Sequence, residues 1–369
     1  MRFDATEQTL KSYPLHFVTR HHHRMNWDQL DWAALDRLRE GFLTGAAANG
    51  PYWRAPSDLA SYDLTYAERI GWKWDALLAE LRLRGWRPSP GGLLLDWGCG
   101  SGVAGRRTLA TFGTETFSAL AVWDHSPLAR TFAAGRAREA FPTLAVSEFA
   151  DTGQSIGLLV VSHVLNELPT DARAQLLGLI ARAAAVIWIE PGTHADSRAL
   201  AAVRDQLRAG HRIVAPCTHR ESCPLFQAAH ERDWCHFFAP PPVGIQNHSE
   251  WVRFSHRAGL DLRSQAYSCL VLDTPSTPSS RQSASCDGGA RLIGRAEVFK
   301  PYARFLACEA TGLHELELPK RVAPALVKRL DKDPPVPLYT LVHDGKRASQ
   351  MTPLVGEPPA PADEAHPDA

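Results

Sequence analysis

The sequence has no long apolar run and no excess of charge of either sign, and each absence excludes a class of protein. No stretch reaches the roughly 18 apolar residues that a membrane-spanning helix needs, so we expect no membrane contact. The first residues lack the apolar core of a secretion signal, which predicts that the protein is not exported. Forty basic residues balance forty acidic ones. This charge balance excludes a uniformly basic nucleic-acid-binding protein, but it is compatible with a local basic face.

Cysteine is also sparse, and its distribution is uneven. Seven cysteines in 369 residues are too few for a disulfide scaffold. Three of them, Cys217, Cys223 and Cys235, fall in one short segment among Pro, His, Arg and Glu rather than in an apolar run. In a reducing compartment such a cluster indicates a metal site before it indicates disulfides. The alternative is three buried cysteines that pack as small apolar side chains.

The middle of the chain alternates between short apolar runs and stretches with helical periodicity. The expected strands are 91–95, 120–123, 144–146, 156–161 and 185–189. Helices are expected between them; one of these begins at Thr170, which can cap it, and carries Leu176 and Ile180 on one face. Alternation of this kind predicts a mostly parallel sheet with helices on both faces.

The flanking segments differ from this alternating core. Before it, Leu35, Leu38 and Phe42 share one helical face, and a second apolar row that ends near Gly85 predicts a longer helix. After it, strand-like stretches return on either side of a Ser/Thr/Pro-rich loop at 274–285. The expected segments are a disordered tail (1–25), a helical N-terminal region (26–90), a cofactor-binding core (91–210), a cysteine-rich insert (211–245), a segment that completes the sheet and carries a fourth cysteine (246–330), and a mostly disordered tail (331–369).

A glycine-rich loop follows the first expected strand, with the sequence Asp96-Trp97-Gly98-Cys99-Gly100-Ser101-Gly102. Glycines in such a loop let the backbone approach a ligand closely, and the next helix offers unpaired N–H groups. Asp124 ends the second expected strand, where a carboxylate can accept hydrogen bonds from both hydroxyls of a ribose. The order of strand, loop, helix, strand and acid predicts a nucleotide-type site rather than a tight turn without a ligand.

The form of the loop narrows the choice of ligand. Dinucleotide-binding loops read Gly-x-Gly-x-x-Gly, whereas this loop reads Gly-x-Gly-x-Gly after an acid, which resembles the first motif of class I methyltransferases. An acid before the glycines suits the amino-acid end of S-adenosylmethionine and would repel a pyrophosphate. The resemblance implies an α/β, Rossmann-like class I methyltransferase fold. The cofactor-binding residues that it implies are Asp96, Gly98, Gly100, Gly102, Asp124 and, at the position that often contacts adenine, Asp151.

The end of the fourth expected strand faces the transferred methyl group in this fold. It reads Ser162-His163-Val164-Leu165-Asn166-Glu167-Leu168-Pro169. This segment has neither the Asn/Asp-Pro-Pro-aromatic motif of amino-nitrogen methyltransferases nor the Pro-Cys nucleophile that acts on pyrimidine carbon 5. We expect His163, Asn166 and Glu167 to line a pocket, but no residue stands out as a catalytic base.

The spacing Cys-x5-Cys-x11-Cys does not decide which metal the cysteine segment holds. Zinc would take the three thiolates and either His219 or His236. An iron–sulfur cluster would ordinarily take a fourth thiolate. Of the later cysteines, Cys308 is the best placed, because it ends an expected strand just before a turn.

Several segments together resemble the methyltransferase-like family associated with the mitochondrial small ribosomal subunit. The specific ones are Ile189-Glu190-Pro191-Gly192-Thr193, Val214-Ala215-Pro216-Cys217-x-His219 with Cys223-Pro224-Leu225, and Trp234-Cys235-His236-Phe237. The resemblance implies a [4Fe–4S] cluster held by Cys217, Cys223, Cys235 and Cys308. It also implies a role in small-subunit assembly, with the protein bound to ribosomal RNA. Two departures are Thr218, which stands in place of a proline, and the absence of the Trp-Gly-Asp expected near the end.

The expected function is that of an S-adenosylmethionine-binding, cluster-bearing factor that acts on the small ribosomal subunit or its rRNA. It would work in a bacterial cytoplasm or, in a eukaryote, in the mitochondrial matrix. One alternative is a methyltransferase of unrelated substrate with a structural zinc site, and another is a non-catalytic RNA-binding assembly factor. Methyl transfer itself and the oligomeric state are left open. The expected RNA contacts are Arg212, Arg220, Arg232, Lys320, Arg321, Lys328 and Arg329.

Overall fold

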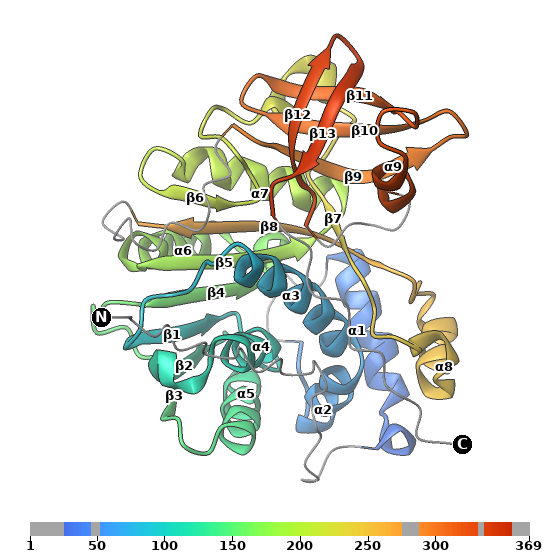
Figure 1. Ribbon diagram of the computed structural model, residues 1–369. Helices are drawn as coiled ribbons and strands as arrows, with labels where there is room; N and C mark the ends of the chain where they lie inside the picture. Colours follow the sequence, from blue (N-terminus) through green and yellow to red (C-terminus); the bar gives the residue numbers. More distant parts are fainter. Residues whose placement is uncertain (1–25, 46–51, 275–287, 331–335, 356–369) are drawn as a thin grey trace, which may run out of the picture.

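The apolar runs of the middle of the chain form the strands of one large sheet (Figure 1). The computed structural model describes residues 26–45, 52–274, 288–330 and 336–355. The strands of the sheet are β1 (Gly92–Trp97), β2 (Phe117–Trp123), β3 (Val146–Glu148), β4 (Leu158–Ser162), β5 (Ala185–Pro191), β6 (Arg212–Ala215), β7 (Phe237–Ala239) and β8 (Gln265–Asp273). Their order is β3-β2-β1-β4-β5-β8-β6, with β7 also paired to β8. Strands β1 to β5 are parallel, and β8 runs antiparallel to β5.

Helices cover both faces of this sheet, as the alternating pattern predicts. Because successive side chains of a strand point to opposite faces, Leu94 packs in the core with α3, α4 and α5, whereas Leu95 packs in the core with α6 and α7. The helices concerned are α3 (Tyr66–Leu83), α4 (Val103–Phe112), α5 (Pro127–Ala140), α6 (Thr170–Arg182) and α7 (His194–Leu207). The predicted α/β fold with a mostly parallel sheet is confirmed.

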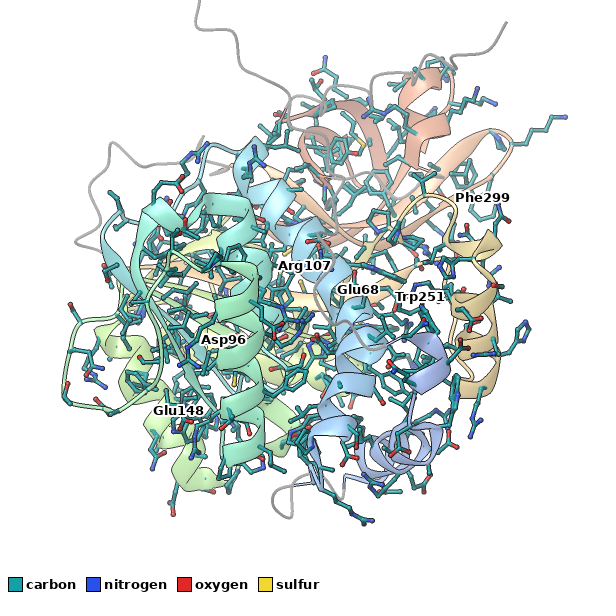
Figure 2. The ribbon with its side chains drawn as sticks, turned by 90° about the horizontal axis from the view of Figure 1, so that it is seen from below. Glu68, Asp96, Arg107, Glu148, Trp251 and Phe299 are labelled. Atoms are coloured by element: carbon teal, nitrogen blue, oxygen red, sulfur yellow. The ribbon has the colours of Figure 1, made fainter. Side chains whose placement is uncertain are left out.

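The N-terminal region is helical, and it packs against a helix from much later in the chain. It contains η1 (Trp27–Gln29), α1 (Trp32–Thr44), α2 (Pro56–Leu64) and α3. Trp251 of α8 (Ser249–Ala258) lies 5.2 Å from Trp27 and 5.1 Å from Trp72, between ring centroids, and so joins α8 to this region (Figure 2). None of the helices in the described ranges is long and apolar enough to cross a membrane.

The cysteine-rich segment differs from the separate insert expected from sequence. Its two strands, β6 and β7, both pair with β8 and so belong to the edge of the main sheet. Between them lie only two short turns of 3₁₀ helix, η5 (Pro224–Phe226) and η6 (Ala228–His230). A third turn, η7 (Ile245–Asn247), follows β7. The buried apolar residues of the segment, among them Val214, Leu225 and Phe237, pack into the core of the main sheet, and backbone pairing to β8 adds to its order.

The C-terminal part forms a closed barrel rather than a continuation of the sheet. Its elements are β9 (Ala290–Val298), β10 (Tyr302–Glu309), β11 (Gly312–Pro319), α9 (Pro324–Leu330), β12 (Leu338–Asp344) and β13 (Arg347–Pro353). Strands β12 and β13 lie within the segment expected to be a mostly disordered tail, and they contribute Leu338, Tyr339, Ala348 and Met351 to the buried core. The expected N-terminal tail at 1–25, nearly all of the loop at 274–285, and the chain after 355 lie outside the described residues.

A buried ion-pair network attaches the barrel to the helices over the sheet. Glu80 of α3 and Arg291 of β9 are each 2% exposed and form an ion pair. Arg84 donates to Glu80 at 3.1 Å and to the backbone oxygen of Val214 at 2.6 Å. Because an unpaired buried charge is costly, these contacts hold β9, α3 and β6 in one arrangement.

Candidate functional site

The glycine loop after β1 has a backbone that only glycine adopts without strain. Gly98, Gly100 and Gly102 have φ angles of 69°, 50° and 81°. A Cβ atom on Gly98 would lie 2.5 Å from a methyl group of Val164, and one on Gly102 would lie 2.9 Å from Ala133. At Gly100 a Cβ would meet no atom within 4 Å, because this residue faces a cavity.

Asp96 supports the loop from beneath rather than lining the cavity. It is 1% exposed, and its Oδ2 accepts a hydrogen bond of 2.9 Å from the backbone N–H of Gly105, in the first turn of α4. Its Oδ1 has no hydrogen-bond partner among the described residues. Burial raises the pKa of Asp96 to about 7. Asp96, which the sequence predicts to bind the cofactor, therefore lies outside the cavity lining and stabilises the loop through its hydrogen bond to α4.

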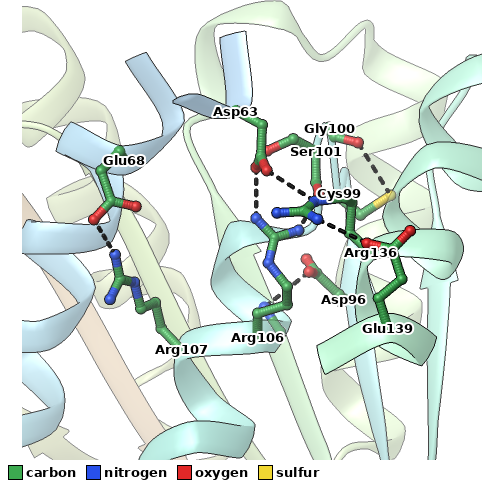
Figure 3. A network of polar contacts seen from close by, with 11 residues as sticks. Asp63, Glu68, Asp96, Cys99, Gly100, Ser101, Arg106, Arg107, Arg136 and Glu139 are labelled. Atoms are coloured by element: carbon green, nitrogen blue, oxygen red, sulfur yellow. Dashed lines mark hydrogen bonds and ion pairs between the residues drawn. The ribbon is translucent and has the colours of Figure 1, made fainter. Parts of the chain in front are cut away.

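A polar network above the loop connects it to the N-terminal helices (Figure 3). Arg106 of α4 donates to the backbone oxygen of Ser101 at 2.6 Å and pairs with Asp63 of α2. Arg136 of α5 pairs with the same carboxylate at 3.2 Å. These two cations hold the pKa of Asp63 below its usual value although burial opposes them, so the pairs stay charged.

Asp124 lies where the sequence predicts it, at the carboxyl end of β2 and against the loop. Its Oδ2 accepts a 3.0 Å hydrogen bond from the backbone N–H of Gly100, and its Oδ1 accepts one of 2.9 Å from that of Ser126. It is 5% exposed and lines the cavity. A carboxylate oriented in this way retains lone pairs for ligand hydroxyls.

The cavity occupies about 520 Å³ between the strand ends and the N-terminal helices. Its floor is formed by the glycine loop, Asp124 and the end of β4, where His163, Asn166 and Glu167 line it as expected. Its aromatic wall comes from Phe42, Tyr52, Trp53, Tyr62, Tyr66, Trp97 and Trp123. A concave pocket with an aromatic wall and polar groups at the strand ends is typical of a small-molecule site.

A stacked tryptophan pair separates this cavity from a second one. Trp97 and Trp123 have ring centroids 4.7 Å apart and planes within 10° of each other, and both line both cavities. Asp151 lines only the second cavity and pairs with Arg182 at 2.7 Å. The structure therefore places this predicted adenine contact beyond the tryptophan pair, apart from the glycine loop.

A lysine–histidine pair lines the first cavity near the end of β4. Lys73 Nζ of α3 is 2.9 Å from His163 Nε2, and His163 Nδ1 is 3.1 Å from the hydroxyl of Ser162. His163 has a φ of 56°, which is rare for a non-glycine residue and common at functional sites. Burial lowers the pKa of Lys73 to about 7 and keeps the pKa of His163 well below its usual value. Sequence analysis missed Lys73, although it is a cation among the apolar positions of one helix.

Replacing Lys73 with methionine should flatten the pH dependence of stability above neutral pH. In the unfolded chain the lysine titrates near 10.4, whereas in the folded chain its pKa is about 7. Between these values the unfolded state binds more protons, so stability rises with pH by up to about 1.4 kcal/mol per unit. Urea unfolding between about pH 7 and 9.5 measures this slope. Lys346, which is 80% exposed, provides the matched Lys→Met control; equal slopes in all three proteins would contradict the assignment.

Four cysteines from separate elements converge where the sheet meets the barrel. Cys217 follows β6, Cys223 precedes η5, Cys235 precedes β7, and Cys308 lies in β10. All four are free and half-buried. Burial raises the pKa of Cys235, and the neighbouring Cys217, Cys308 and Cys223 raise it further. Cys217, Cys223 and Cys308 therefore lie near enough to Cys235 to influence its titration.

The groups around these thiols are polar and fixed by α7. Arg204 is 2% exposed, donates to the backbone oxygen of His219 at 2.8 Å, and interacts electrostatically with Cys217. Asp205 accepts from the backbone N–H of Cys223 at 3.0 Å. His219 Nε2 lies 3.5 Å from the sulfur of Cys308. Polar groups held by α7 therefore surround the four cysteines.

Comparison with known proteins gives one family and a set of distant structural neighbours. The family described as mitochondrial small ribosomal subunit Rsm22 matches residues 92–298. This range extends from the start of β1 to the end of β9. It includes the glycine loop and three of the four converging cysteines, namely Cys217, Cys223 and Cys235. No curated protein matches the sequence.

Two solved structures illustrate the neighbours. Magnesium protoporphyrin IX methyltransferase (ChlM) from Synechocystis PCC 6803, with bound SAM, is 13% identical with a TM-score of 0.34, over 69% of this chain and 100% of that chain. Protein 1320 of Thermoplasma acidophilum is 12% identical with a TM-score of 0.30, over 51% of this chain and 82% of that chain. Because both TM-scores are low, the fold class follows from the chain's own sheet topology instead.

Proposed function

This chain belongs to the Rsm22 family, described as mitochondrial small ribosomal subunit, and from that premise we propose that it is an S-adenosylmethionine-dependent methyltransferase-type factor acting on the small ribosomal subunit or its RNA. The single observation that carries the proposal is the cavity bounded by Gly100, Asp124 and the end of β4. This one cavity is lined both by the glycine loop, which would bind the cofactor, and by the end of β4, which would face the transferred methyl group.

The residues of the cavity suit the parts of S-adenosylmethionine. Asp124 offers acceptors for the ribose hydroxyls, and the open space at Gly100 lets the ligand approach the backbone. The aromatic wall offers faces on which an adenine can stack. The bound cofactor would supply an electrophilic methyl group.

Lys73 and His163 would together remove a proton from the nucleophile that accepts the methyl group. Near neutral pH a fraction of Lys73 is unprotonated, because burial lowers its pKa to about 7. The lone pair on Nζ is then free to accept a proton from an entering hydroxyl or amine. His163 Nε2, at 2.9 Å, orients that nitrogen. The dyad would thus act as a general base in the same cavity as Asp124.

We also propose that Cys217, Cys223, Cys235 and Cys308 hold a [4Fe–4S] cluster. The four cysteines are half-buried and come from separate elements. A four-iron cluster binds one thiolate on each iron, and these four cysteines offer that number. The alternative is zinc with His219, whose Nε2 lies 3.5 Å from the sulfur of Cys308. The cluster would tie the β6–β7 segment to β10 of the barrel.

Methyl transfer provides the test of the proposed function. Labelled S-adenosylmethionine is incubated with the purified chain and isolated small-subunit RNA or whole subunits, with Lys73→Met as a variant of the dyad. We expect labelled methyl groups in the RNA. The variant should transfer them at least about tenfold more slowly, because a general base typically contributes about a hundredfold or more to the rate. Cofactor binding without transfer to either substrate would favour the alternative of a non-catalytic assembly factor.

RNA binding is expected to depend steeply on salt. Lys320, Arg321, Lys328 and Arg232 are exposed, as phosphate contacts require. Arg212 and Arg220 are already engaged: Arg212 pairs with Asp273, and Arg220 donates to the backbone oxygens of Arg208 and His211. The structure therefore favours the exposed set over these two arginines.

Replacing Lys320, Arg321 and Lys328 together with alanine should lower the salt slope of RNA affinity by about two, since each phosphate contact on a single strand contributes about 0.7. Fluorescence anisotropy with labelled small-subunit RNA at several salt concentrations measures this slope. Arg263, which is 83% exposed and lies on another part of the surface, provides the control as Arg263→Ala. A wild-type affinity that does not change with salt would refute the electrostatic mode.

A further inference from the structure

Three metal-binding side chains meet on the barrel, and none of them belongs to the cysteine site. Glu309 ends β10, His314 lies in β11, and His343 lies in β12. One donor atom from each lies within 4.8 Å of the other two, and no other such group occurs in the described part of the chain. The residues come from three strands of the barrel, so the barrel itself sets their separation.

One of the two imidazoles, that of His343, is oriented as a metal-bound histidine is. His343 Nδ1 is 3.1 Å from the backbone oxygen of Gly345, which directs Nε2 toward Glu309, 3.6 Å away. The ring of His314 lies 5.1 Å from that of His343. Its Nε2 is 3.0 Å from the hydroxyl of Thr311. A hydrogen bond from one ring nitrogen to a backbone carbonyl, with the other nitrogen facing the centre, is the usual arrangement around a metal-bound histidine.

The carboxylate of Glu309 is incompletely paired. Its Oε2 accepts a 3.4 Å hydrogen bond from Thr311 and faces His343. Its Oε1 is buried and has no hydrogen-bond partner in the described ranges. An ion pair with a protonated His343 would satisfy Oε2 but leave Oε1 unpaired. A cation between the carboxylate and the two imidazoles would pair with this incompletely bonded carboxylate, because buried charges are ordinarily paired or bound to metal.

We propose that Glu309, His314 and His343 bind a zinc ion on the barrel. Two histidines and a glutamate are a donor set that zinc accepts with a fourth position left for water or another ligand. Side-chain exposures of 17% for Glu309 and 20% for His343 leave the ion a route to solvent. The ion would fasten the β10–β11 turn to β12. This inference is independent of methyl transfer and of the cysteine cluster.

Zinc binding by the purified chain, with its cysteine site occupied, provides the test. Calorimetry with Zn²⁺ alone should show one site per chain that weakens at least about a hundredfold in His314→Ala, His343→Ala and Glu309→Gln, about 2.8 kcal/mol. Glu315→Gln, a neighbour on β11, and His256→Ala, on α8, remove the same residue types elsewhere and should bind as the wild type does. Circular dichroism verifies that each variant is folded.

Cobalt substitution distinguishes this site from the cysteines. Co²⁺ on nitrogen and oxygen donors gives weak visible bands, whereas Co²⁺ on thiolates adds an intense near-ultraviolet band. We expect the weak bands alone, and we expect them to disappear in folded Glu309→Gln. Zinc affinity unchanged in all three variants, or a cobalt spectrum dominated by the thiolate band and unaffected by them, would overturn the proposal.

Discussion

Replacing Gly100 with leucine should weaken S-adenosylmethionine binding at least about a hundredfold, or about 2.8 kcal/mol. The chain itself has room for the new side chain, because a Cβ on Gly100 meets no atom within 4 Å. That space is the cavity, so leucine would occupy the volume where the ligand must approach the loop. The backbone N–H of Gly100 also donates to Asp124, so a shift of the loop would misplace the ribose acceptor too. Calorimetry with S-adenosylmethionine measures the loss.

A matched variant separates this steric effect from backbone strain. Gly91 has a φ of 78° and is exposed, and a Cβ on this residue would likewise meet no atom within 4 Å. It lies at the other end of β1, outside the cavity. Gly91→Leu should therefore cost a similar strain energy, about 1–3 kcal/mol, yet leave cofactor affinity unchanged. Equal affinity in wild type and Gly100→Leu would refute the proposed cofactor site.

Replacing Cys308 with serine should remove the proposed iron–sulfur cluster almost completely. Cys308 comes from β10, whereas the other three cysteines come from the β6–β7 segment. Its loss would leave three thiolates on a segment with little core of its own, and metal ligation supplies much of the folding free energy of such segments. Iron and sulfide analysis of anaerobically purified protein should show a full cluster in wild type and close to none in the variant.

Cys269 is the natural control for this prediction. It lies in β8, is 4% exposed, and is near enough to Cys235 to raise its pKa. The Cys269→Ser variant should retain its iron. The Cys308→Ser variant should bind S-adenosylmethionine within about threefold of the wild-type affinity, a difference of less than about 1 kcal/mol. Stoichiometric zinc without sulfide in wild type, with His219 required and Cys308 dispensable, would establish the zinc alternative instead.

The order of strands and helices could be predicted because each signal is local. The runs that became β1, β2, β4 and β5 are apolar over several residues, and a strand buried on both faces needs no partner to be recognised in sequence. The glycine loop is equally local, since Gly98, Gly100 and Gly102 each carry their own positive φ. The family was predicted from short motifs, and its match to residues 92–298 confirms it.

The barrel was missed because its strands are individually weak. In β12 and β13 only Leu338, Tyr339, Ala348 and Met351 are buried, and the other residues of both strands are half-buried or exposed. Such a pattern near Pro- and Ala-rich sequence is hard to distinguish from a disordered tail. The strands are stable only in the closed barrel, where β12 pairs with both β13 and β9. The pairing of β6 and β7 with β8 was missed for the same reason.

The sequence by itself determined the alternating core, the position of the glycine loop and Asp124, and the cysteines that could act together. Only the tertiary structure decided that Asp96 lies under the loop and that Asp151 lies beyond the tryptophan pair. It alone brought Lys73 to His163 and Glu309 to His343. These residues are far apart in the chain, and their meeting depends on helix packing and strand register, which no local pattern encodes. Local propensity therefore specified the elements, whereas burial and long-range pairing specified which side chains share a site.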